Sequence, residues 1–291
     1  MHTLLIAAAI FSFQNNFWVN LHQFLHAEAL RRAAGRPVQL ESSLVDGYAA
    51  VAKRDLMRDA ALRAVNDALA EVEGDVLPAT IDPTIAAALT RAAPVYRATL
   101  WPQHRQANEA WIAKIRPVVD RIAPALTEQL AKAYHTKWPM APILIDVSVA
   151  AGAVGGYTTL DDPPGFAGHS TISSVKEGVD DDMAVEIVFH EASHTVGPDI
   201  MRLIASEAGR QGVRTPPNLW HALIFYTSGE LVRQALDKVG DSHYMPYAYR
   251  FDVYERGMVT DRVALERDWQ PWLDGKVAFE EALRALVKDA R

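Results

Sequence analysis

The five residues His-Glu-Ala-Ser-His, from His190 to His194, restrict the local fold of this chain most tightly. On an α-helix, residues i and i+4 lie on one face about one turn apart, so His190 and His194 can direct two imidazoles at one metal ion. Glu191 follows the first histidine and can take a proton from a metal-activated water without binding the metal itself. The motif therefore requires a helix and predicts a metal site on it.

The residues on either side of the motif predict that helix. Asp180–Asp182 offer an N-cap and place negative charge at the positive end of the helix dipole. Apolar residues then follow at Met183, Val185, Ile187, Val188 and Phe189. Gly197 and Pro198 are typical of a helix end, a glycine C-cap followed by proline. We expect a helix of about four turns.

Composition excludes several classes of function. The chain has 291 residues, with 29 Lys and Arg against 36 Asp and Glu, a net charge of −7 and no long block of one sign. Nucleic acid is therefore not an expected partner, because phosphate binding needs a clustered basic surface. There is no cysteine, so disulfides, thiolate metal sites and cysteine nucleophiles are excluded. Any metal must be held by histidine and carboxylate.

The first residues resemble a secretory signal. The run Leu4–Phe11 is apolar and contains three small residues, Ala7 to Ala9, although no Lys or Arg precedes it. We assign residues 1–14 as a signal-like segment and expect export, periplasmic or secreted. A buried first helix or strand in a cytoplasmic protein is the alternative. The run is too short to span a bilayer, so no integral membrane segment is expected.

Residues 15–138 are expected to form a helical N-terminal lobe. Apolar residues repeat at helical spacing from Phe17 to Ala29, and a second long run extends from Leu40 to Val72. The prolines that follow are expected to divide the rest into shorter helices or to mark their first turns. These prolines are Pro78, Pro83, Pro94, Pro102, Pro117 and Pro124.

Residues 139–291 are expected to form the catalytic region. Ile143–Val149 is rich in β-branched residues and predicts a strand, and Ser170–Ser174 predicts a short one directly before the motif helix. Further helices are expected at about 199–210, 217–239 and 263–288. The fold class is therefore α+β, predominantly helical, with a small β-sheet followed by the motif helix.

This order of a small sheet, a strand and an HExxH helix resembles the zincin metallopeptidases. The resemblance covers residues from about 140 to 240 and is specific only at the five-residue motif. It implies Zn²⁺ as the cofactor, a peptide or protein as the substrate, and hydrolysis of a peptide bond.

Two histidines leave a zinc ion one protein ligand short if the fourth position is kept for water. The metzincin pattern, with a third histidine six residues after the motif, fails because Ile200 stands there. The gluzincin pattern takes a glutamate from a later helix and offers Glu207 or Glu230. We favour Glu230, because its helix is mostly apolar and small Ser228 and Gly229 beside it allow close approach.

The chain also departs from the familiar gluzincins. The interval from His194 to Glu230 is longer than in the thermolysin-like groups, and Gln234 stands where an aspartate four residues after Glu230 would be. Asp237, on the same face, is an alternative residue for orienting a ligand histidine. The chain is therefore gluzincin-like and fits no characterised family.

Hydrolysis also needs a donor for the developing oxyanion. Tyr226, one turn before Glu230, and His221 are the nearest candidates, although His221 lies about half a revolution from Glu230 around the helix. Tyr244, Tyr247 and Tyr249 form a second group of hydroxyls. Ser170–Ser174 is a candidate edge strand for pairing with an extended substrate. Packing roles are the alternative for each of these.

The sequence thus predicts a zinc-dependent peptidase in which His190, His194 and Glu230 bind Zn²⁺ and Glu191 is the general base. Three alternatives stay open. One is a helical di-iron carboxylate protein, although the chain has no second ExxH. Another is a non-catalytic binding or scaffold protein that contains zinc. The third is an amphipathic helix whose histidines hold no metal.

Overall fold

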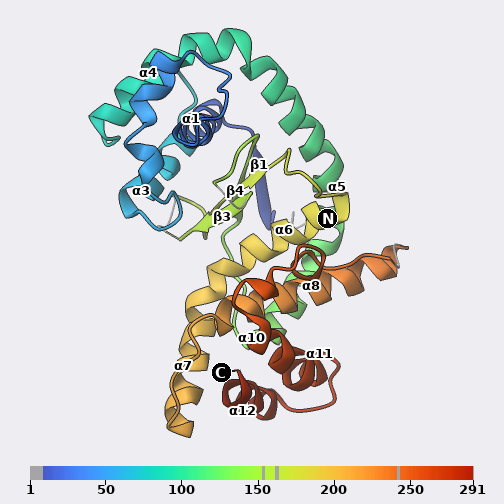
Figure 1. Cartoon of the computed structure of the whole chain (residues 1–291). Coiled ribbons are helices and arrows are strands. Elements are labelled where there is room, and N and C mark those ends of the chain that lie inside the picture. Colours follow the sequence, from blue (N-terminus) through green and yellow to red (C-terminus); the bar gives the residue numbers. More distant parts are fainter. Residues whose placement is uncertain (1–8, 153–154, 161–163, 241–242, 291) are drawn as a thin grey trace. The chain divides into compact units, whose positions relative to one another are not determined.

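The computed structural model describes residues 9–152, 155–160, 164–240 and 243–290 (Figure 1). The chain forms two compact units that interleave in sequence. Unit 1 contains the residues up to Pro117 together with Ala141–Val179, and unit 2 contains Val118–Met140 and Asp180–Arg291. This division differs from the expected boundary at residue 138, because the strands expected in the catalytic region belong with the N-terminal helices.

Unit 1 combines helices with one small sheet. Its helices are α1 (Phe17–Ala33), α2 (Ser42–Val45), α3 (Ala60–Ala70), α4 (Pro83–Thr99) and the part of α5 (Trp101–Ala133) up to Pro117. The side chain of Asn16 caps α1 by accepting from the backbone N–H groups of Trp18 and Val19. One apolar core joins α1, α3 and α4, and Leu144 and Tyr157 of the sheet belong to it.

The sheet has four strands in the order β1-β2-β4-β3: β1 (Phe11–Gln14), β2 (Ile143–Ser148), β4 (His169–Ser173) and β3 (Gly156–Thr159). The first three are parallel, and β3 is antiparallel to β4. Both strands predicted from the sequence are confirmed as β2 and β4, and the fold is α+β and mostly helical. The prediction of Ser170–Ser174 as an edge strand is wrong, because β4 pairs with β2 on one side and β3 on the other.

The N-terminal helices differ in part from expectation. The run Leu40–Val72 is divided into α2, two 3₁₀ turns (Asp46–Tyr48 and Val51–Lys53) and α3. Proline marks the first turn of α4 at Pro83, as predicted. Three other prolines lie inside helices instead of dividing them: Pro94 in α4, and Pro117 and Pro124 in α5.

The signal-like segment falls partly outside the described residues, which begin at residue 9. Within it, Phe11–Gln14 forms β1 and pairs with β2 from Ile143 to Asp146. Across the described ranges, no helix is both long enough and apolar enough to cross a membrane.

Unit 2 is built of helices throughout its described part. They are the rest of α5, α6 (Asp181–Ser193), α7 (Gly197–Gln211), α8 (Leu219–Val239), α9 (Tyr247–Arg250), α10 (Val259–Ala264), α11 (Gln270–Leu273) and α12 (Phe279–Asp289). Short helical turns cover His194–Val196, Tyr254–Arg256 and Leu265–Trp269. The helices expected at 199–210 and 217–239 are confirmed as α7 and α8, whereas the one expected at 263–288 is several short pieces.

The motif residues from His190 to Ser193 lie on α6 as predicted, but the helix ends differently. Asp180 is the N-cap, and its carboxylate accepts from the backbone N–H of Met183 at 2.9 Å. The α-helix stops at Ser193, and His194 begins a 3₁₀ turn that leads directly into α7. Gly197 has φ −52°, so it begins α7 and is not a left-handed C-cap. The predicted stop at Gly197 and Pro198 is therefore wrong.

A buried histidine bridges two carboxylates in unit 1. His169 of β4 contacts Asp146 of β2 through Nε2 and Asp67 of α3 through Nδ1, both at 2.7 Å. Burial lowers the pKa of His169, but the hydrogen bonds and charges of Asp146 and Asp67 outweigh burial and raise it to about 9. The imidazole is therefore held protonated between the two carboxylates, and it ties α3 to the sheet.

This histidine predicts how stability depends on pH. Its pKa is higher in the folded protein than the ~6.5 of an unfolded chain, so its contribution is complete below ~6.5 and is lost as the pH rises through about 9. Urea unfolding followed by circular dichroism should show the free energy of unfolding falling between about pH 7.5 and 9.5. That window avoids Glu186, whose pKa burial raises to about 7. The fall should be absent in His169→Gln, and a constant stability in the wild type would contradict a protonated His169.

In unit 2, the packing of α6 against α8 depends on a glycine. The two helices lie side by side (Figure 1). A Cβ on Gly229 of α8 would lie 3.1 Å from Oε1 of Glu186 on α6 and 2.9 Å from Cβ of Pro246. The expectation that Gly229 permits close approach is therefore correct, and the element that approaches is the helix of the motif.

Gly229→Ala should lower the free energy of unfolding by about 1–3 kcal/mol, because the added methyl group overpacks this contact. Gly209→Ala is the matched control, since a Cβ at this glycine of α7 meets nothing within 4 Å. That control should stabilise the protein by ~0.5–1 kcal/mol, as alanine does in a helix interior. Equal effects of the two substitutions in urea unfolding would show that the α6–α8 contact is not tight.

Candidate metal centre

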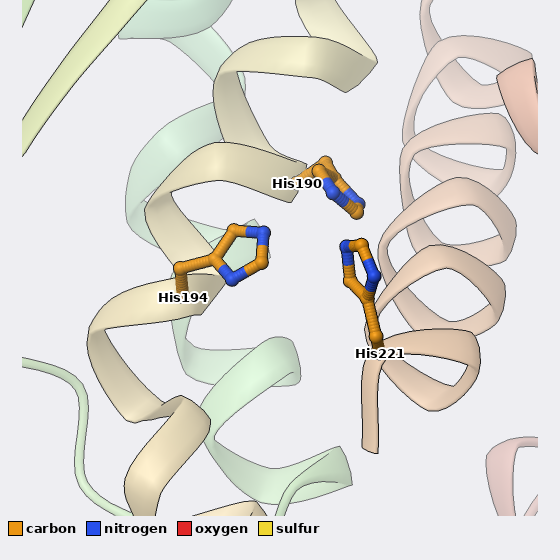
Figure 2. A group of neighbouring side chains, drawn as sticks. All are labelled: His190, His194 and His221. Atoms are coloured by element: carbon orange, nitrogen blue, oxygen red, sulfur yellow. The ribbon is translucent and has the colours of Figure 1, made fainter. Parts of the chain in front are cut away.

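Three histidines of unit 2 meet between α6 and α8. One nitrogen from each of His190, His194 and His221 lies within 4.8 Å of the others. Figure 2 shows the three rings turned toward one another, two from the ribbon that carries the motif and one from the start of α8. No other group of three His, Asp or Glu residues in the described part of the chain is gathered this closely.

Burial keeps the three imidazoles neutral. Burial is the largest cause in each case, and it lowers the pKa of His194 to about 3 and of His221 to about 4. It also lowers the pKa of His190 well below its usual range, reinforced by the two neighbouring histidines. Neutral imidazole is the form that binds a metal ion, so no proton has to leave before the group can act as ligands near pH 7.

His190 also carries a buried atom that the protein leaves without a partner. Its Nδ1 makes no hydrogen bond to any residue that the structure describes. Buried polar atoms are nearly always paired, so an orphaned nitrogen on one of these three histidines is a departure that packing alone does not explain. The ring itself is fixed by stacking on Phe225, with centroids 4.0 Å apart.

Glu191 lies beside this group without belonging to it. Its side chain is buried, and Oε2 is 4.0 Å from Nε2 of His194. This is the placement that the motif predicts for a general base, adjacent to the metal ligands and one residue from the first of them. The predicted pair His190 and His194 is thus brought together with Glu191 beside it.

Glu230 is not part of the group. Its carboxylate accepts from Nε and Nη2 of Arg233 at 2.9 and 2.7 Å, and from Nε2 of Gln234 at 2.8 Å. Asp237 accepts from Nη1 of the same arginine at 2.8 Å. The prediction of Glu230 as third ligand therefore finds no support in the geometry, because the carboxylate is paired within its own helix.

Glu207, the other candidate, has equivalent surroundings on α7. It accepts from Nε of Arg210 and Nε2 of Gln211, both at 2.8 Å. Both glutamates stand in the pattern Glu-x-x-Arg-Gln, which supplies a cation three residues on and an amide four residues on. Residues at these spacings are neighbours on a helix surface, so the sequence holds a signal that both carboxylates are paired within their helices.

His221, which the sequence offers as an oxyanion donor, stands where the third ligand is needed. Glu230 is nine residues further along α8, about half a revolution away on an ideal helix. The two side chains therefore lie on different faces, and it is His221 whose ring lies near those of His190 and His194. Phe225, one turn after His221, shares that face and lies 4.7 Å from it, centroid to centroid.

Three of the four tyrosines named from the sequence form hydroxyl hydrogen bonds elsewhere in unit 2. The hydroxyl of Tyr226 donates to Oε1 of Gln270 at 2.6 Å. Tyr244 donates to Glu186, whose Oε2 also accepts from the backbone N–H of Tyr247 at 2.9 Å. Tyr249 donates to Glu266 at 2.7 Å. Only Tyr247 has its ring connected with the histidines, through Phe225.

The donor set limits which metals fit. Three imidazoles suit zinc, copper, nickel or iron, whereas calcium and magnesium prefer oxygen ligands. Zinc with three protein ligands keeps a fourth position open and is the usual choice where no redox chemistry is needed.

Metal content distinguishes His221 from Glu230 as the third ligand. Wild-type protein dialysed against zinc should bind about one ion per chain, as a three-ligand site requires. His221→Ala should lose the ion, whereas Glu230→Ala and Glu207→Ala should keep it. Retention by His221→Ala with loss in Glu230→Ala, measured by plasma emission spectrometry, would restore the glutamate as ligand.

Comparisons with known proteins found no match: no protein-family model, no curated protein and no solved structure matches the chain.

Proposed function

We propose that this protein is a zinc-dependent hydrolase that cleaves peptide bonds. The observation that carries the proposal is the group of three imidazoles, one buried and two partly buried, with the Glu191 carboxylate beside it. A purely structural zinc site has four protein ligands and no use for an adjacent carboxylate, whereas a catalytic site has three ligands and needs a base.

Each residue has one task in this reaction. His190, His194 and His221 hold the ion, and zinc, when bound, polarises the peptide carbonyl and makes a water more acidic. Glu191 accepts the proton of the attacking water and returns it to the nitrogen of the departing amine. The two transfers leave the carboxylate as it began, so one residue serves as general base and then as general acid.

Several features support this proposal over the di-iron alternative. A di-iron centre needs four carboxylates in addition to two histidines. The described group at this site contains three histidines, and Glu230 and Glu207 are engaged by arginine and glutamine. A non-catalytic zinc protein is the remaining rival, and it differs from a hydrolase in what Glu191 does.

Glu191→Gln tests the proposal, since the amide keeps the shape of the side chain but cannot accept a proton. The variant should bind zinc normally and lose roughly 10²–10⁴-fold in kcat, the usual contribution of a general base. Cleavage of a mixed peptide library is followed by mass spectrometry. Glu280→Gln, at an exposed position of α12, is the matched control and should behave as wild type.

Two outcomes would count against hydrolysis. Equal cleavage by wild type and Glu191→Gln would remove this residue from the mechanism. Full zinc occupancy with no peptide cleaved by the wild type would favour the non-catalytic zinc protein.

A further inference from the structure

A row of partly exposed aromatic rings continues from the histidine group along α8 and α9. We call it the aromatic strip, and it consists of Trp220, Phe225, Tyr247 and Phe251, each half-buried. By contrast, the large rings of the unit 2 core are almost completely buried: Trp269 is 1% exposed and Tyr254 2%. The strip is therefore a surface feature, not an extension of the core.

Ring contacts make the strip continuous with the metal centre. Phe225 stacks on His190 at 4.0 Å, and Tyr247 is nearly parallel to Phe225, with an interplanar angle of 8° and centroids 6.4 Å apart. Phe251 follows at 4.8 Å from Tyr247. At the other end, Trp220 lies 5.7 Å from His194. The imidazoles thus lie within a series of rings and not at its margin.

The helix that carries the motif also holds the far half of the strip in place. Glu186, one turn before His190 on α6, accepts from the backbone N–H of Tyr247 at 2.9 Å and from the hydroxyl of Tyr244. These bonds join the start of α9 to α6. The position of the Tyr247 ring is therefore determined by the same helix that positions the first predicted ligand.

The strip offers an apolar surface to whatever reaches the metal centre. Its four members carry no charge. Partly exposed aromatic rings grouped beside a site gain from covering by another apolar group, and rings pack best against rings in offset or edge arrangements.

We propose that the aromatic strip receives a large apolar or aromatic side chain of the peptide substrate, at the residue next to the bond that is cleaved. This inference rests on the proposed hydrolase function and names its substrate class: peptides with bulky apolar residues beside the scissile bond. Phe225 and Tyr247 are the specificity-determining residues, because they are the members nearest to His190 along the series.

The affinities of two hydroxamates distinguish the contribution of the strip to binding from that of the metal. Acetohydroxamate and 3-phenylpropanohydroxamate chelate zinc through the same group, and only the second carries a ring that can cover the strip. In calorimetric titration of the zinc-loaded protein, the phenyl compound should bind roughly ten times more tightly than acetohydroxamate, or better, because it buries more apolar area. The ratio should fall toward one in Phe225→Ala and in Tyr247→Ala.

Tyr249→Ala is the matched control for Tyr247→Ala, because Tyr249 lies on the same short helix but bonds Glu266 instead of facing Phe225. It should preserve the ratio of the two affinities. If Tyr247→Ala does not fold, Phe225→Leu gives the same comparison with a smaller loss of volume.

The results also separate failure of this inference from failure of the function on which it rests. Equal affinity for the two hydroxamates, or cleavage sites flanked mainly by small or acidic residues, would overturn the role of the strip and leave a zinc hydrolase. A protein that binds no zinc, or whose zinc binds neither hydroxamate, would overturn both.

Discussion

The packing of α6 against α8 is the constraint on which the candidate site depends. His190 and His194 come from the motif at the end of α6, and the third imidazole comes from the first turn of α8. The three can meet only if the two helices approach closely, and Gly229 makes that approach possible by leaving room for Glu186. Glu186 in turn holds the start of α9, so one contact positions the histidines and the aromatic strip together.

Burial in this region has two consequences that reinforce each other. It removes water from the imidazoles and so keeps them neutral, as metal binding requires. It also removes possible hydrogen-bond partners, and Nδ1 of His190 is left without one among the described residues. A buried nitrogen without a partner is costly to maintain, so the arrangement supports a proposal of function and not only of packing.

Local chemistry made much of this fold predictable. The strands β2 and β4, the helices α7 and α8, the Asp180 cap and the pairing of His190 with His194 all follow from patterns within a few residues. The rest depends on long-range packing. The structure brings His221, and not Glu230, near His190 and His194. Periodicity gives no such information, because α8 is buried on more than one side. Likewise, Pro117 and Pro124 signal helix ends locally, but α5 continues through both.

All three histidines and the full aromatic strip belong to unit 2. A ligand that binds only the folded form stabilises it by mass action, by ~2.7 kcal/mol when its concentration is a hundred times its dissociation constant. Occupancy of the site is therefore linked to the folding equilibrium of this unit. On the proposed function, a cell that withholds the metal would hold a less stable protein as well as an inactive one, so that supply of the ion would set both the lifetime and the activity of the molecule.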